Sequence, residues 1–176
     1  MAVPVCYSFV YQGGILSAAI ARFGFVTRGV SHVDCVMPDG SLAGARSDRI
    51  KPPGSNIAIE PGFRIRPDDY EHWERRDIVR LWVSKTAAKK RLAWIKHHIG
   101  DPYDTGAIIG FLLGHADHDR GAYICSAAAT ASAVAGGIIG KPPVPVSQIT
   151  PNDLRLMLYA AGGESILSYG FKRNGR

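Results

Sequence analysis

The sequence predicts a single α+β domain, and three observations lead to that expectation. The chain has 176 residues, close to the usual size of one domain. Hydrophobic residues make up 46% of it and charged residues 20%, which excludes an intrinsically disordered chain and a highly charged coiled coil. Strand patterns fill most of the first half, and helical patterns dominate the second. We therefore expect one domain over residues 1–176.

The first predicted strand and hairpin lie near the N-terminus. Val3–Val10 is β-rich and is followed by a loop and a short helix at Ile15–Phe23. Ser31–Met37 and Leu42–Arg46 are also β-rich, and Pro38–Ser41 between them has the composition of a tight turn. These two segments are expected to form a hairpin.

Three further strands are predicted before the first long helix. Ile57–Ile59 and Phe63–Ile65 lie among prolines and glycines, which is typical of edge strands joined by irregular loops. Apolar residues alternate around Arg80 in Ile78–Val83, which predicts another strand.

A surface helix is predicted at Ala87–Ile99, with its N-cap at Ser84–Thr86 and its stop at Gly100. Its expected inner face is apolar, and its basic side chains are expected to lie mostly elsewhere. The apolar positions are Ala88, Leu92, Ile95 and Ile99, and the basic ones are Lys89, Lys90, Arg91 and Lys96.

Three more helices and a tail complete the chain. Helices are predicted at Thr105–Leu113, at about Cys125–Ala135, and at Asp153–Ala161 after the start signal Thr150–Pro151. In the last of these, Leu154, Leu158 and Ala161 are expected to face inward. Residues 171–176 are expected to be a flexible basic tail.

Net charge, apolar runs and cysteine spacing bear on the partners and the cellular compartment of the protein. The net charge of +6 permits an anionic partner but is equally explained by solubility. No apolar run approaches the roughly 20 residues of a membrane span, so no span is expected. The N-terminus lacks the features of a secretory signal, which favours the cytoplasm and leaves phage association or another export route open. Three widely spaced cysteines indicate reduced thiols rather than a disulfide framework.

Cys125 is the sharpest chemical signal. It stands at the predicted start of a helix whose next turns are almost all small residues. Unpaired backbone N–H groups and the positive end of the helix dipole favour the thiolate there, as a nucleophile requires. The alternative is a buried cysteine that serves as a small hydrophobic residue.

A candidate base lies in the predicted strand of the hairpin. Strand periodicity places His32 and Asp34 on one face and Cys35 on the other. A carboxylate can orient an imidazole that deprotonates a thiol, so His32 and Asp34 are candidate partners of Cys125. Cys35 is a poor nucleophile candidate. The alternative for His32 is a hydrogen-bonded strand histidine with no catalytic role.

The order of these motifs resembles a known family. Ser31–Val33, Gly44–Arg46, Gly100–Asp104 and Cys125–Ser126 follow one another as in the circularly permuted branch of the NlpC-type papain-like superfamily, which includes relatives of lecithin retinol acyltransferase. The resemblance runs from about Gly29 to the helix at Pro151.

This resemblance implies a papain-like fold, an antiparallel sheet packed against helices, with Cys125 as nucleophile and His32 as general base. Tyr103 could border the site and touch substrate, or simply pack beside Pro102. The third polar residue that the family supplies aligns with Gly44, so Asp34 is expected to replace it. The acidic residue common two positions after the cysteine is here Ala127.

Other site types fit less well. His115–Asp119 could hold a metal but lacks a second ligand pair at zinc spacing, and no metal or other cofactor is expected. Gly136–Lys141 departs from the phosphate-loop pattern. The basic helix face lacks interleaved aromatic residues, so no nucleic-acid partner is expected.

The sequence therefore predicts a cysteine hydrolase, a peptidase or amidase, with a peptide or acyl-amide substrate. Cell-wall peptide amide bonds are the leading guess, because the resemblance implies them. The alternatives are an acyltransferase and a non-enzymatic binding or structural module with a decayed site. The oligomeric state is left open.

Overall fold

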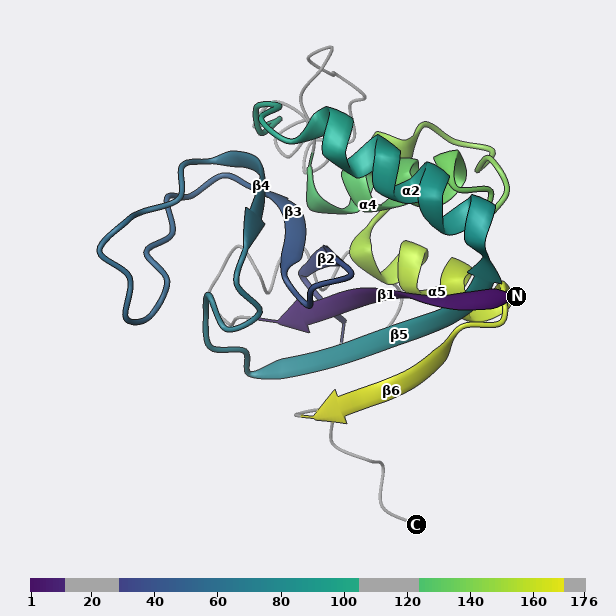
Figure 1. Cartoon of the computed structure of the whole chain (residues 1–176), viewed down its shortest axis with the longest axis horizontal. Coiled ribbons are helices and arrows are strands. Elements are labelled where there is room, and N and C mark those ends of the chain that lie inside the picture. The colour runs from purple at the N-terminus through teal and green to yellow at the C-terminus, as the bar shows by residue number, and fades with distance from the viewer. Residues whose placement is uncertain (12–28, 105–123, 170–176) are drawn as a thin grey trace.

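A six-stranded antiparallel sheet forms the framework of the protein. The computed structural model describes residues 1–11, 29–104 and 124–169. The strands are β1 (Ala2–Tyr11), β2 (His32–Val36), β3 (Leu42–Arg46), β4 (Gly62–Arg66), β5 (Arg75–Ser84) and β6 (Glu164–Tyr169). Their order across the sheet is β4-β3-β2-β1-β5-β6, and every neighbouring pair is antiparallel (Figure 1).

Three α-helices in the described residues pack on one face of this sheet. They are α2 (Lys85–His98), α4 (Cys125–Ala135) and α5 (Pro151–Ala160), with a short 3₁₀ turn, η1 (Val146–Gln148), before α5. Alternate strand residues such as Tyr7, Val33 and Val79 meet Ala128 of α4 and Leu158 of α5 in one apolar core. The period-2 alternation of the strands thus supplies one wall of the core, and the fold is α+β as predicted.

The loops between β3 and β5 form a smaller core on the opposite face. Val10 and Leu42 from the sheet pack there with Ile50, Tyr70 and Trp73 from the connecting segments. The sheet is therefore buried on both faces near β2 and β3. His32 and Asp34 belong to this second face, since they alternate with Val33 and Cys35 of the main core.

The predicted hairpin is confirmed. β2 and β3 pair with Cys35 opposite Ala43 and Val36 opposite Leu42. The turn closes through a 2.8 Å bond from Met37 N–H to Ser41 O. Gly40 has φ of 87°, a conformation that side chains disfavour, so the turn needs glycine there. The β2–β3 pairing ends at Cys35, whereas residues 32–34 pair with β1.

The other strand predictions have mixed outcomes. Val3–Val10 and Ile78–Val83 lie within the ten-residue strands β1 and β5, and Phe63–Ile65 lies within β4. Ile57–Ile59 is not a strand, because only Ile59 pairs, in a single bridge with Ile50. β6 was not predicted: its polar and apolar residues are all exposed and show no buried alternation.

The helix after β5 begins two residues earlier than predicted, and one of its residues faces the other way. The Ser84 side chain caps it by accepting from the Ala87 N–H at 3.1 Å. Arg91 was expected outside but is buried, where its guanidinium donates to Tyr7 Oη and to the backbone oxygens of Cys6 and Val36. A long side chain can cross a core when hydrogen-bond acceptors at its end satisfy the charged group. Ile99, expected inside, is exposed beyond the helix end.

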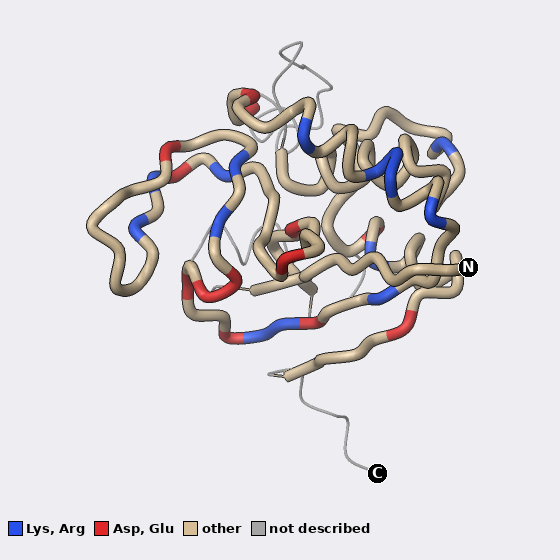
Figure 2. The backbone as a smooth tube through the Cα atoms, viewed as in Figure 1, with Lys and Arg blue, Asp and Glu red and all other residues tan. Residues whose placement is uncertain are grey.

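The remaining α2 cations are solvent-exposed. Lys85, Lys89, Lys90 and Lys96 are all exposed, and Figure 2 shows blue segments, Lys and Arg, along this helix. This arrangement agrees with the predicted basic outer face and with a role in solubility.

Both later helices predicted within the described residues are present, and α5 begins two residues before the predicted Asp153 and ends one residue before the predicted Ala161. α4 has the predicted bounds. α5 starts with Pro151 at its first position, and Thr150 and Asp153 form a reciprocal capping box. Leu154 and Leu158 are buried as expected, whereas Ala161 is exposed because the helix has already ended.

Some predictions fall outside the described residues. They are the helices at Ile15–Phe23 and Thr105–Leu113, the segment His115–Asp119, and the tail 171–176. Within the described part of the chain, no helix combines the length and the apolar character that crossing a bilayer requires.

Candidate active site

His32 and Asp34 meet through their side chains at the start of β2. Neighbours two apart on a strand are separated by about 6.5 Å at Cα. Nevertheless, His32 Nε2 lies 3.0 Å from Asp34 Oδ1. Both side chains are buried, so the pair forms a charge-assisted hydrogen bond shielded from water. The structure thus brings together the two residues that strand periodicity placed on one face.

The thiol of Cys125 completes the cluster. Cys125 is the first residue of α4 and is buried, and it hydrogen-bonds to the His32 side chain and to the backbone of Val33. Because Nε2 of His32 is engaged by Asp34, Nδ1 is the ring nitrogen left for the thiol. The helix can approach β2 this closely because its first turns carry small side chains, including Ala128 and Ala129, which are buried against the sheet.

The electrostatics of this cluster favour a thiolate–imidazolium pair. Burial alone lowers the pKa of His32, but the charges of Asp34 and Cys125 and its hydrogen bonds to both outweigh burial and raise that pKa to about 9. Burial alone raises the pKa of Cys125, yet the His32 charge and hydrogen bond, with the Val33 backbone bond, hold it below its ordinary value. A His32 pKa of about 9 makes the imidazole positive near neutral pH, and this charge favours the thiolate form of Cys125.

The start of α4 also has backbone hydrogen-bond donors that the helix itself does not use. The helical series begins with Ala128 N–H donating to Ile124 O at 3.1 Å. The N–H groups of Cys125, Ser126 and Ala127 therefore have no partner within the helix, as at every helix N-terminus. No side chain of the described residues caps this end. Such donors, together with the helix dipole, stabilise a negative charge that develops beside the sulfur.

Two residues that sequence reasoning missed surround Asp34. Tyr70 Oη donates to Asp34 Oδ2 at 2.9 Å, and the guanidinium of buried Arg66 contributes a nearby positive charge. Burial raises the pKa of Asp34, but His32, Arg66 and Tyr70 together lower it below its ordinary value. Asp34 is therefore a carboxylate in the folded protein. Both missed residues lie more than thirty positions from Asp34, and no local pattern links them to it.

Gly44 explains how Asp34 takes this position. A Cβ atom added to Gly44 would stand 1.7 Å from Asp34 Oδ1, far inside contact distance. The carboxylate occupies the space that any side chain at position 44 would need. The absence of a side chain at Gly44 is therefore the steric condition for Asp34 to reach His32.

Tyr103 borders the cluster. It is partly buried and packs against Ile124 and Ala127 at the start of α4. Burial, followed by the negative charge of Cys125, raises its pKa well above the ordinary value. The prediction that Tyr103 lies beside the nucleophile agrees with this geometry, and Tyr103 is a neutral phenol near neutral pH.

The remaining cysteines lie away from this cluster. Cys35 is buried on the opposite face of β2, where its sulfur lies 3.4 Å from Ser132 Oγ. Cys6 is partly exposed on β1. Burial raises the pKa of both thiols. Within the described residues, no hydrogen bond joins either sulfur to an imidazole.

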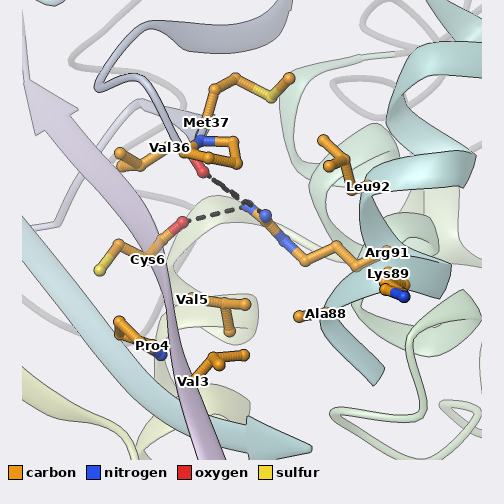
Figure 3. A pocket seen from close by; sticks show the side chains of 11 residues that line it. Val3, Pro4, Val5, Cys6, Val36, Met37, Ala88, Lys89, Arg91 and Leu92 are labelled. Atoms are coloured by element: carbon orange, nitrogen blue, oxygen red, sulfur yellow. Dashed lines mark hydrogen bonds between the residues drawn. The ribbon is translucent and has the colours of Figure 1, made fainter. Parts of the chain in front are cut away.

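A pocket of about 370 Å³ opens at the other end of β2. It lies between the start of β1, the β2–β3 turn and α2, and its walls include Val5, Met37, Leu92 and Arg91 (Figure 3). The Arg91 guanidinium spans its base toward the backbone oxygens of Cys6 and Val36. None of the His32, Asp34 and Cys125 side chains lines it, so this pocket is separate from the candidate active site.

Comparison with known proteins adds no relative to this description. No family model matches the chain, and no curated protein matches it at a significant level. Among the residues that the structure describes, no group of three or more His, Cys, Asp or Glu side chains is placed to hold a metal ion.

Proposed function

We propose that the protein is a cysteine hydrolase, a peptidase or amidase, of the circularly permuted NlpC-type papain-like superfamily. The observation that carries the proposal is the buried hydrogen-bonded series Cys125–His32–Asp34 at the N-terminus of α4. A thiol, an imidazole and a carboxylate in this order form a nucleophile, its base and the group that orients the base. The resemblance in motif order supports the family, and the antiparallel sheet with helices on one face is compatible with it.

The reaction follows from the charges of the three groups. The Cys125 thiolate attacks the carbonyl carbon of an amide, forming a C–S bond and an oxyanion that α4 backbone N–H groups stabilise. The tetrahedral intermediate collapses as the C–N bond breaks, and His32 gives its proton to the leaving amine. His32 then takes a proton from a water molecule, which attacks the thioester and releases a carboxylic acid and the Cys125 thiolate. Asp34 keeps the imidazole oriented throughout.

The substrate class is a peptide or acyl amide, and cell-wall peptides are the substrates to test first. An acyltransferase would share every step up to the thioester and differ only in using another acceptor than water. A binding module that retained the fold with a decayed site would need no ionised thiol. The steric fit of Asp34 over Gly44 argues against decay, since the carboxylate replaces the missing third residue.

The test combines thiol reactivity with product analysis. Iodoacetamide labelling across pH should modify Cys125 well below the roughly 8.5 pKa of free cysteine, ahead of Cys6 and Cys35. Incubation with cell-wall peptides should release equal amounts of new amine and new carboxylate, and Cys125→Ala should abolish this release. A transferase would consume the peptide without matching carboxylate when an acceptor amine or alcohol is present. Uniformly slow thiols and uncleaved peptides would refute catalysis and favour the binding module.

A further inference from the structure

We propose that Tyr70 is a positioning residue of the site, which acts on His32 by fixing the carboxylate of Asp34. The inference rests on the proposed function, because positioning matters only if His32 and Cys125 react. It adds a residue that belongs to neither the nucleophile nor its base.

The hydrogen bonds of Asp34 carry the argument. Its Oδ1 lies 3.0 Å from His32 Nε2, while its Oδ2 accepts from Tyr70 Oη at 2.9 Å. A carboxylate held by one oxygen alone can rotate, since the terminal torsion of aspartate is broad. Holding both oxygens fixes the carboxylate plane and thereby the direction in which Oδ1 faces the imidazole. The Tyr70 hydroxyl also lies 3.4 Å from His32 Nε2, so it closes a triangle with the pair.

The surroundings of Tyr70 show that its own position is held. Its side chain is 2% exposed, and its ring makes an edge contact with Trp73 at 5.0 Å between centroids. The guanidinium groups of Arg46 and Arg66 each lie 5.6 Å from the ring centre. Tyr70 N–H bonds to Pro67 O at 3.2 Å in the turn after β4. A rigid ring presents its hydroxyl at a fixed point, as a supporting residue requires.

The protonation state of Tyr70 suits this role. Burial and the Asp34 charge keep the pKa of Tyr70 well above its ordinary value, so the hydroxyl keeps its proton and donates. The two guanidinium groups beside it have other partners as well, although Arg46 Nη1 also donates to Tyr70 Oη at 3.5 Å. Arg46 pairs with Asp48 and Glu71, and Arg66 donates to the backbone oxygens of Gly44 and Gly62.

The test is Tyr70→Phe, which keeps the ring and removes the hydroxyl. We expect turnover to fall about tenfold with little change in KM, because Tyr70 does not touch substrate. The decisive readout is the titration of His32, followed by NMR and assigned with His32→Gln. Loosening of Asp34 should bring the pKa of His32 down from about 9, so the alkaline limb of turnover moves to lower pH.

Tyr159→Phe is the matched control. Tyr159 Oη donates to Asp77 Oδ2 at 2.7 Å, which is a second tyrosine–aspartate bond outside the site. The control should lose a similar hydrogen bond without moving the His32 titration. A shift of equal size in both variants, or no shift in Tyr70→Phe, would overturn the inference. Tyr70→Phe should also have no further effect in an Asp34→Asn background, and an additive loss would contradict action through Asp34.

Failure of the inference and failure of the proposed function give different results. If wild-type His32 titrates near 6.5 and Cys125 behaves as an ordinary thiol, the proposed function fails. If both are perturbed in the wild type and Tyr70→Phe leaves them unchanged, only the role of Tyr70 fails. Should Tyr70→Phe not fold, the wild-type chain still provides a test. A slowly exchanging Tyr70 hydroxyl proton with a nuclear Overhauser contact to the His32 ring is expected, and its absence would overturn the inference.

Discussion

Two buried cysteines in the same core differ in their chemistry because of what faces them. Cys35 and Cys125 are both buried and both contact β2 or belong to it. Cys35 lies beside the Ser132 hydroxyl and also feels the charge of Arg91, yet burial outweighs both and raises the pKa of its thiol. The neighbour of Cys125 is His32, whose charge overcomes burial and lowers the pKa of that thiol. Burial raises the pKa of both thiols, and only at Cys125 do the partner charge and hydrogen bonds outweigh it.

Removal of each sulfur should produce the largest difference between them. Cys125→Ala removes the nucleophile and should reduce turnover of a cleaved peptide by at least about 10³-fold. Cys35→Ala removes only a packed sulfur and should leave turnover within about twofold, at a stability cost of about 1 kcal/mol. Steady-state kinetics and thermal unfolding of both variants measure the contrast. A large loss of turnover in folded Cys35→Ala would contradict the contrast between the two cysteines.

Removal of the charged partner should make Cys125 resemble Cys35. In His32→Gln, the thiol loses the group that lowers its pKa, so its rate of alkylation at pH 7 should fall on the order of 10- to 100-fold. The label on Cys125 is quantified by mass spectrometry after timed exposure to iodoacetamide. His97→Gln, on the exposed side of α2, is the control and should change nothing. An unchanged alkylation rate in His32→Gln would show that the helix terminus, not the histidine, activates the thiol.

The contrast between the cysteines was accessible from sequence only in part. Period-2 alternation placed His32 and Asp34 opposite Cys35, and small residues after Cys125 indicated a close-packed helix start. Those features are local, so the sequence carries them. The contact between Cys125 and His32 joins residues 93 positions apart, and only the resemblance pointed to it. Tyr70 and Arg66 carry no signal, because their link to Asp34 depends on how the loops after β3 and β4 return to the second face of the sheet.

The fold shows the same division between local and non-local information. The hairpin turn and the start of the last helix at Thr150–Pro151 follow from short-range chemistry and were predicted. Arg91 was placed on the wrong side because helical periodicity treats arginine as an outward residue, whereas Tyr7 Oη and two backbone oxygens satisfy its guanidinium inside. β6 was missed because an exposed edge strand needs no alternating pattern.

Neutralising Asp34 tests how far its charge controls the pKa of His32, the partner of Cys125. Asp34→Asn removes the largest influence that raises the pKa of His32, so this pKa should fall from about 9 toward 6.5. Turnover should fall on the order of 10-fold to 100-fold, and its alkaline limb should move to lower pH.

Folding stability provides an independent check on the same variant. The charged His32 stabilises the fold fully below pH 6.5, and that contribution is lost as pH rises through about 9. In Asp34→Asn the loss should occur over a narrower and more acidic range. Denaturant unfolding measured between pH 6 and pH 10 tests this, and identical pH dependences in the two proteins would contradict it.

A methyl group at position 44 should give the smallest effect, and it tests whether space rather than charge sets the geometry. The added Cβ in Gly44→Ala would meet Asp34 Oδ1, so the carboxylate must turn away from His32 or the strands must separate. Asp34 keeps its charge, so the loss of turnover should not exceed that of Asp34→Asn, and we expect several-fold. Gly140→Ala is the matched control, because a Cβ there meets nothing within 4 Å. The two melting temperatures and the two His32 titrations separate the possibilities. A lower melting temperature without a change in His32 would mean that the strands yield while Asp34 stays, whereas a lowered His32 pKa would show that the space over Gly44 holds the carboxylate in place.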